Sequence, residues 1–443
     1  MTRAASHSLL TIALLGSLAL GLSACGDKAD TSTPVGSGGS EQPDSPDGVD
    51  SPAPDKPGTT PIKPVVLPEM GPLTQGLASD ILHAPFGSLA SLDPEMVRSS
   101  LGMLARLGDR ALVDAVNAEL LVKDEDGVYH DTESAAIGLL ALHQLGEKGA
   151  SDRILALAKF ALDDEDIDLE AIAIALDAVP NAKADALLIR IVEVNDDEFG
   201  STEGLRALAR RRVEAALPLF KKVAAEAQAS PSSSSSNDYS DDQHALAVAG
   251  LLGLGDPAGM DQIDRWAAVA ESAVDLDDVL VHLGVRGLSE AADAVVRIMD
   301  AVIEADAIGF EPASACIALG EIFHAGGGES YRDHIRRYRD LPDSEASDEA
   351  NLALLRTGDA SVFPKVAASL KFSVSDPFNH DADATFAVLE TITIRGLSGD
   401  PSLAQILAVG AQLRPEVDMK PGPRDRAMLV NCACAYAYLV SRK

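Results

Sequence analysis

Residues 245–268 decide the fold of this 443-residue chain, and they read ALAVAGLLGLGDPAGMDQIDRWAA. The first part is apolar on nearly every side, as in a buried helix. Gly255 suits the left-handed position that follows a helix end. Asp256 can cap a second helix that opens with Pro257. The stretch therefore predicts two helices joined by a tight turn, and such a hairpin needs neighbours of its own kind to bury both faces.

The same turn recurs along the chain. Gly-Asp pairs follow apolar stretches at four places, Gly108-Asp109, Gly255-Asp256, Gly358-Asp359 and Gly399-Asp400. The last two are 41 residues apart (399 − 358). The longer intervals divide into units of about 34 and 37 residues, in the range of helical-hairpin repeats. Weaker turn signals fill the intervals, at residues 146–147, 179–181, 209–210, 287–289 and 326–328. We therefore expect about nine hairpins and a final helix around residues 425–440.

Leu-Gly-Asp turns inside Ala- and Leu-rich helix pairs resemble HEAT repeats, especially the short HEAT-like repeats also found in phycobilisome lyases. Pro218 and Pro364 stand early in the second helix of their units, where such repeats tolerate proline. The resemblance covers roughly residues 75–443. It implies an all-α fold for residues 71–443, an α-solenoid of about nine HEAT-like helical hairpins. The regular aromatic positions of tetratricopeptide repeats and the Thr-Pro-Leu-His signature of ankyrin repeats are missing from the sequence.

Residues 1–24 have the features of a bacterial lipoprotein signal peptide. A basic start precedes an apolar run that is too short to span a bilayer comfortably. The run ends in Leu22-Ser23-Ala24-Cys25, which resembles a lipobox. The resemblance implies a covalent diacylglyceryl group and an N-acyl lipid on Cys25, and several acyl chains hold a protein firmly on a membrane. The alternative is an ordinary signal peptide in which the cysteine is incidental.

Two segments lack the large apolar residues that a folded core requires. Residues 25–68 begin with the lipidated cysteine and are rich in Gly, Ser, Pro, Asp and Thr, so we expect a disordered tether there. Residues 229–242 read ASPSSSSSNDYSDD, a polar insertion that we expect to be neither helix nor core. This insertion is either an enlarged loop, which costs little closure entropy, or a contact loop or flexible joint between two solenoid halves.

The net charge of −33 argues against a nucleic-acid partner, because phosphate contacts need clustered Lys and Arg. The charge fits either a solvated surface or an acidic face that meets a basic partner or divalent cations. Most acidic clusters stand near expected helix starts, where carboxylates complement the helix dipole. Residues 124–127 and 381–383 resemble parts of calcium loops, but each lacks the full ligand set.

Two basic islands interrupt the acidic background and are the candidate partner-binding residues. The first contains Arg206, Arg210, Arg211 and Arg212, and the second contains Arg336, Arg337 and Arg339. If several of them share a face, they could grip an acidic partner or lipid headgroups. The alternative is that they pair with acidic residues of neighbouring repeats.

The sequence offers no catalytic residue, cofactor site or metal site. It contains no phosphate-binding loop, hydrolase or zinc-protease motif. The His-Glu dipeptides of the HEAT-like deoxyhypusine hydroxylases, which bind two irons, are also missing. His324 and His334 could approach one another across a turn, but no third ligand is evident. Cys316, Cys432 and Cys434 are an odd number, so we expect small buried side chains rather than a disulfide framework.

These features favour a membrane-anchored bacterial lipoprotein that acts as a protein–protein interaction scaffold. The partner would be an unknown protein, and the location a membrane of the cell envelope outside the cytoplasm, inner or outer. One alternative is a phycobilisome-lyase-like or other enzyme on a HEAT-like framework, although a lipoprotein outside the cytoplasm is poorly placed to meet bilins. The other is a purely structural envelope protein.

Overall fold

The computed structural model describes part of the chain, and everything structural below refers to that part. The described residues are 105, 111–164, 167–194, 198–229, 239–268, 276–304, 312–324, 326–339, 344–362, 365–366 and 391. They form α-helices and short 3-10 helices; within these ranges there is no strand, and one isolated β-bridge joins Lys123 to Tyr129. The all-α class is confirmed for the residues described.

The helices alternate between two roles, which we call first and second helices of a hairpin. The first helices are α5 (Thr132–Gln144), α7 (Glu170–Asp177), α9 (Glu198–Arg210), α11 (Tyr239–Gly253), α13 (Leu276–Leu283), α15 (Pro312–Ile322) and α17 (Ser344–Arg356). The second helices are α6 (Ala150–Ala161), α8 (Ala182–Val194), α10 (Leu217–Ala229), α12 (Pro257–Ala268), α14 (Ala292–Glu304) and α16 (Arg332–Arg339). Helix α4 (Ala111–Glu119) precedes them, and 3-10 turns at Glu214–Ala216, Ser289–Ala291, Glu329–Tyr331 and Ala360–Val362 complete the order.

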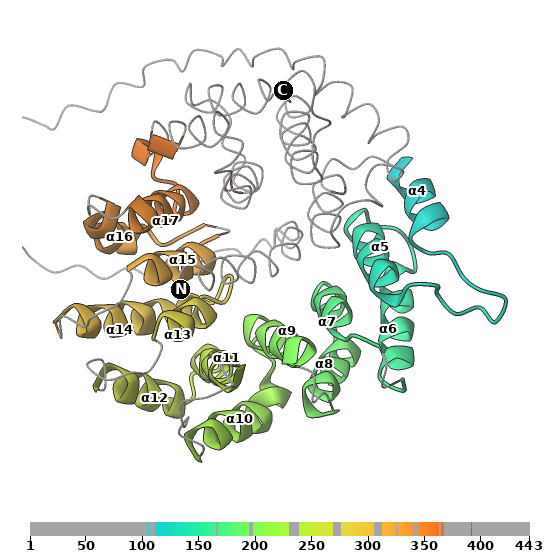
Figure 1. The fold of residues 1–443 in the computed structure, drawn as a ribbon, viewed down its shortest axis with the longest axis horizontal. Coiled ribbons are helices and arrows are strands. Elements are labelled where there is room, and N and C mark those ends of the chain that lie inside the picture. Colours follow the sequence, from blue (N-terminus) through green and yellow to red (C-terminus); the bar gives the residue numbers. More distant parts are fainter. Residues whose placement is uncertain are drawn as a thin grey trace, which may run out of the picture.

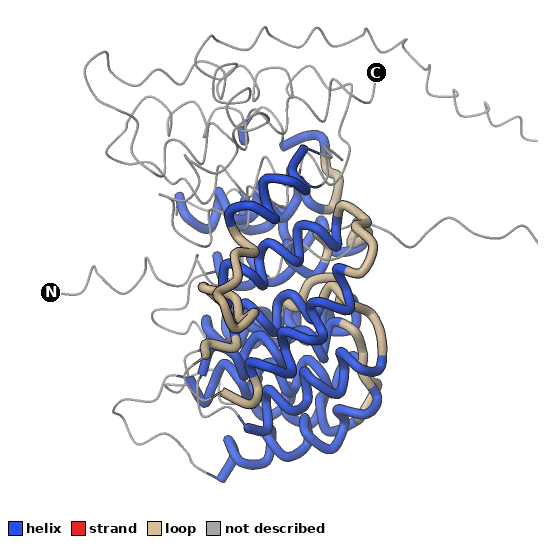
Figure 2. Tube along the Cα trace, turned by 90° about the vertical axis from the view of Figure 1, so that its right-hand side faces the viewer, coloured by secondary structure: helices blue, strands red, loops and turns tan. Residues whose placement is uncertain are grey.

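Each first helix contacts the first helix of the next hairpin, from α5 to α17. The helices follow one another along an arc, with the first helices on its inner side and the second helices on its outer side (Figure 1). Seen from the side, they lie as successive rows joined by short loops (Figure 2). Contacts along the arc are therefore made mainly between neighbouring hairpins.

The turn predicted at Gly255 has the geometry expected of it. Gly255 has a φ of 67°, its N–H donates to the carbonyl of Leu252, and the N–H of Asp256 donates to that of Leu251. These two bonds make a Schellman motif. The same pair of hydrogen bonds closes three more turns, at Gly146, Arg212 and Gly358.

The start of the following helix is also as predicted. The Oδ1 atom of Asp256 accepts a hydrogen bond from the N–H of Ala258 at 3.1 Å, and Pro257 is the first residue of α12. In the second described Gly-Asp turn, Oδ1 of Asp359 accepts from the N–H of Ser361 at 3.0 Å. Each aspartate thus satisfies an N–H group that the helical turn leaves without a partner.

The structure corrects two boundaries. The polar insertion is helical at both ends, because α10 runs through Ala229 and α11 begins at Tyr239. Asp242 in the first turn of α11 complements the dipole of that helix, which helps to explain how a polar run can begin a helix. The turn expected at residues 209–210 has its left-handed residue at Arg212, with a φ of 51°.

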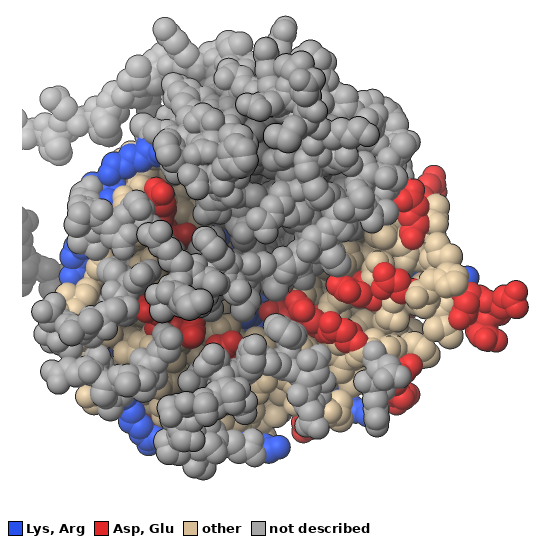
Figure 3. Space-filling model, viewed as in Figure 1, with Lys and Arg blue, Asp and Glu red and all other residues tan. Residues whose placement is uncertain are grey.

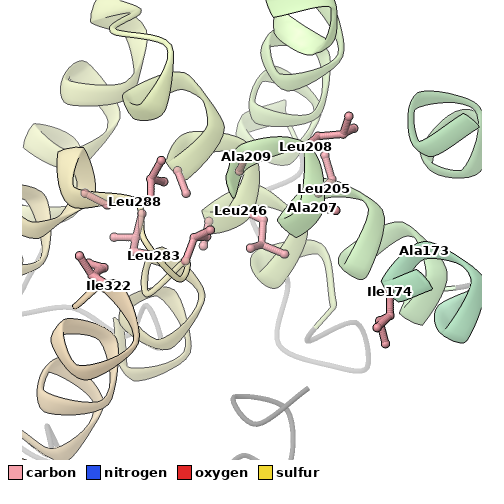
Figure 4. Packing of buried hydrophobic residues seen from close by; sticks show 14 of the residues in the cluster. Ala173, Ile174, Leu205, Ala207, Leu208, Ala209, Leu246, Leu283, Leu288 and Ile322 are labelled. Carbon is pink, nitrogen blue, oxygen red and sulfur yellow. The ribbon is translucent and has the colours of Figure 1, made fainter. Parts of the chain in front are cut away.

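The core continues from hairpin to hairpin. Large apolar side chains of successive first helices lie in one band, as Ile174 of α7, Leu205 of α9, Leu246 of α11 and Leu283 of α13 show (Figure 4). Eight consecutive residues of α5, from Ala135 to Leu142, are buried. Burial on nearly every side explains why α5 and α7 are apolar along most of their length.

Gly250 of α11 allows α10 and α11 to lie close together. A Cβ atom at Gly250 would lie 2.5 Å from two atoms of the Phe220 ring on α10. Phe220 is fully buried and is among the largest such side chains in the described core. Glycine at this position therefore allows the aromatic ring to lie directly against the helix backbone.

Several predictions concern residues outside the described ranges. They are the signal peptide (residues 1–24), the tether (25–68), the Gly108 and Gly399 turns, the partial calcium loop at 381–383, the helix near 425–440, and Cys432 and Cys434. Within the residues described, no helix combines the length and apolar character that crossing a bilayer requires.

Candidate functional site

The first basic island lies on α9 and the turn after it, where its arginines join neighbouring hairpins. Arg210 is buried and forms an ion pair with Asp177 at the end of α7. Burial lowers the pKa of Arg210 to about 9, with the positive charges of Arg286 and Arg211 acting in the same direction. Arg211 pairs with Asp185 of α8 at 2.5 Å.

Arg212 contacts residues that are farther away along the chain than the partners of Arg210 and Arg211. Its Nη2 atom lies 2.6 Å from Oε2 of Glu290 and 3.2 Å from the carbonyl oxygen of Gly287, to which it donates. Hydrogen bonding to Arg212 lowers the pKa of Glu290. The contacts help to hold a non-glycine residue in the left-handed region, a conformation that costs roughly 1–2 kcal/mol for an L-residue.

The second basic island lies on α16 and is more exposed. Arg336 pairs with Asp359 at 2.7 Å and with Asp333 at 2.8 Å. The side chain of Arg337 is 54% exposed, and its nitrogen lies 3.8 Å from Asp300 on α14. Arg339 ends α16, and its carbonyl oxygen accepts a hydrogen bond from Ser347 of α17. The candidate arginines of both islands all lie in the described ranges, and Arg337 is the most accessible of them to a partner.

The structure therefore gives intramolecular partners to most of the candidate arginines. Pairing with acidic residues of neighbouring repeats was the alternative to partner binding that the sequence left open for these arginines. The lipobox residues Leu22, Ser23 and Ala24 and the lipidation site Cys25 lie outside the described residues.

A buried ionic triad, which sequence reasoning did not single out, joins three first helices near their carboxyl ends. Glu321 of α15 lies between Arg286, which follows α13, and Arg356, which ends α17. The distances from its carboxylate are 2.9 Å and 2.6 Å. Burial alone would raise the pKa of Glu321, but the two arginines outweigh burial and lower it.

A polar cluster on α9, α11 and α13 contains the candidate residue Arg206 and three residues that sequence reasoning missed. Glu203 and Arg206 come from α9, Asp242 from α11 and His282 from α13. Nη2 of Arg206 lies 3.4 Å from Nδ1 of His282, and Nε2 of that ring lies 3.0 Å from Oδ1 of Asp242. The signal for this cluster is a histidine within the otherwise apolar end of LDDVLVHL.

The candidate metal ligands are not assembled by the structure. His324 is buried at the end of α15, whereas His334 lies on α16 against Arg337. Oδ1 of Asp124 accepts hydrogen bonds from the N–H groups of Asp126 and Val128, so it serves the turn of its own loop. Within the described ranges, no group of three or more His, Cys, Asp or Glu side chains could hold a metal ion.

Acidic and basic side chains are distributed unevenly on the surface. On the face shown in Figure 3, Asp and Glu gather across the face and Lys and Arg lie mostly toward the outer rim. Chemically, the triad and several arginines of the islands form ion pairs between helices, with Arg210–Asp177 and Arg286–Glu321 as buried examples. Searches against family models, curated proteins and solved structures found no match to this chain.

Proposed function

We propose that this chain is a bacterial lipoprotein whose helical hairpins form a HEAT-like α-solenoid and serve as a protein–protein interaction scaffold in the cell envelope. Cys25 would carry the lipid anchor, residues 25–68 would be the tether, and the solenoid would hold a protein partner outside the cytoplasm. Stacked hairpins present an extended surface, which suits them to grip another macromolecule.

The observation that carries the solenoid is the repetition of one turn with one pattern of contacts. Four turns share the same two hydrogen bonds, and each first helix contacts the next first helix. Contacts limited largely to neighbouring units are the defining property of repeat proteins. We extend this pattern to about nine hairpins because the Gly-Asp turns at 108 and 399 continue it in the sequence.

The distribution of charge separates the buried ionisable groups from an exposed arginine that a partner could meet. The buried ionisable groups of the triad and of the Arg210–Asp177 pair each face an opposite charge on a neighbouring hairpin. These contacts fix the stacking of helices. Arg337, with half of its side chain exposed on the second helix α16, is the candidate arginine best placed to meet an acidic group of a partner.

The anchor is tested by Cys25→Ala in the native host, followed by separation of membranes from soluble protein. The variant should leave the membrane fraction, because the lipid can no longer be attached. Ser23→Ala is a matched control, since it retains a small residue in the lipobox and should stay with membranes. If Cys25→Ala remains membrane-bound in high salt, the lipid anchor is not what holds the protein.

A further inference from the structure

We infer that His282 is a proton-sensitive link between α9 and α13, which acid breaks while α11 and α13 stay connected. The inference concerns the inner layer of helices and does not rest on the proposed partner or membrane anchor. It follows from the charged groups on the two sides of the buried His282 ring.

The ring of His282 is enclosed. The residue is 1% exposed, and its two nitrogens face opposite charges on two different helices. Arg206 of α9 approaches Nδ1 at 3.4 Å, and Asp242 of α11 lies 3.0 Å from Nε2. One side chain of α13 thus touches both of the helices that precede it in the inner layer.

The contact with Arg206 requires a ring that carries no proton on Nδ1. A guanidinium group can only donate hydrogen bonds, so Nδ1 of His282 must accept and cannot carry a proton. The neutral ring then carries its proton on Nε2, facing Asp242. That N–H lies near the carboxylate without being aligned for a hydrogen bond.

Adding a proton changes the two contacts in opposite ways. Protonation of Nδ1 removes the acceptor of Arg206 and places a second positive charge beside the guanidinium. The same proton gives the ring a full charge toward Asp242, with which it can form an ion pair. Arg206 can turn to Glu203, because Oε1 of Glu203 already lies 3.3 Å from its Nε atom. The link to α9 is lost and the link to α11 becomes stronger.

Charged groups on the other helices that pack against α13 are engaged elsewhere. On α14, Asp293 accepts from Tyr331, Arg297 pairs with Asp264, and Asp300 lies near Arg337. On α15, Glu321 is held between Arg286 and Arg356. On α13 itself, Asp277 and Asp278 lie in its first turn, and His244 of α11 lies against Trp266. The ring nitrogens of His282 thus have their described contacts with Arg206 and Asp242.

Hydrogen–deuterium exchange of the full chain tests the inference. Peptides from α9 should exchange about fivefold faster near pH 5.5 than near pH 7.5, after correction for the intrinsic rate, because protonation of Nδ1 removes one hydrogen bond of α9. Peptides from α6 should not change. Equal corrected rates in α9 at the two pH values would overturn the inference.

The variant His282→Gln removes the imidazole ring while keeping an acceptor for Arg206 and a donor for Asp242. Its α9 peptides should exchange at the same corrected rate at both pH values. His143→Gln is the matched control, because His143 is also bonded through both ring nitrogens, to Ala178 and Ser151, but lies far along the chain on α5. His143→Gln should keep the wild-type response of α9. If His282→Gln also keeps it, another group is responsible.

A measurement on the unmodified protein avoids any folding defect of the variant. Nitrogen-15 NMR of histidine-labelled full-length protein near neutral pH should show His282 as the neutral tautomer with its proton on Nε2. A ring protonated on Nδ1 under these conditions would contradict the contact with Arg206.

Discussion

Arg286 and Glu321 form a two-donor ion pair between two consecutive hairpins. Nε and Nη2 of the arginine lie 3.0 Å and 2.9 Å from the same carboxylate oxygen, Oε2. The arginine side chain is 6% exposed and the glutamate side chain 8%. Arg356 reaches the other oxygen at 2.6 Å, so one carboxylate serves three units of the stack. We therefore expect Glu321 to matter more for the stability of the stack than the exposed ion pairs on its surface.

Glu321→Gln should destabilise the protein by about 3–5 kcal/mol, because it removes the carboxylate charge that two buried guanidinium groups share. Urea unfolding followed by circular dichroism measures the change. Glu329→Gln is the matched control, since Glu329 is 65% exposed and lies 3.7 Å from Arg332. That exposed pair should contribute less than about 1 kcal/mol. Equal effects of the two substitutions would show that the triad is not a buried charge network.

The same carboxylate predicts an acid dependence of stability. The pKa of Glu321 is lowered below its ordinary value of 4.5, because Arg286 and Arg356 outweigh the effect of burial. A carboxylate with a lowered pKa in the folded state stabilises fully above its unfolded pKa and loses that contribution as the pH falls through the folded value. The stability difference between wild type and Glu321→Gln should therefore shrink below pH 4.5. A difference that grows in acid would contradict the assignment.

Gly250→Ala should destabilise the α10–α11 contact, because the new methyl group would overlap the Phe220 ring. Overpacking of this kind costs about 1–3 kcal/mol. Phe220→Leu creates space, so the double variant should be more stable than the sum of the two single changes predicts. The cycle is measured by chemical unfolding. Additive effects would show that the Phe220 ring does not require glycine at position 250.

Gly255→Ala tests the recurring turn. The added methyl group would meet no heavy atom within 4 Å, so its effect reports the backbone conformation alone. With a φ of 67° the cost should be about 1 kcal/mol. Gly255→Asn should cost less, because asparagine visits the left-handed region more readily than alanine does. A higher melting temperature for Gly255→Ala than for Gly255→Asn would contradict this explanation.

The turn at Gly255 can be predicted from the sequence because its signals are local. A left-handed glycine, a capping aspartate and a first-turn proline each act within a few residues. Arg212 shows where this reasoning fails, since its left-handed conformation is accompanied by contacts with Glu290 and Gly287, more than seventy residues away. The composition of residues 229–242 likewise hides the helical start of α11, because a polar run gives no apolar periodicity to follow.

The sites are less predictable than the fold. The sequence identifies the arginines of the two islands, but the positions of Asp177, Asp185 and Asp359 relative to them depend on the stacking of hairpins. The partners Arg286 and Glu321 in the triad are 35 residues apart in the chain, close to one repeat. In the sequence His282 resembles an ordinary helical residue, because neither Arg206 nor Asp242 is near it along the chain.

Site-specific photo-crosslinking in the native envelope tests the central claim most directly. A photoreactive amino acid would replace Arg337, whose side chain is 54% exposed on α16, and, as a control, Arg210, whose side chain is 7% exposed. An interaction scaffold predicts a reproducible protein adduct from position 337, identified by mass spectrometry, and none from position 210. If position 337 and further exposed positions on α6, α8 and α14 give no adduct while the protein stays in the membrane fraction, the chain is not an interaction scaffold.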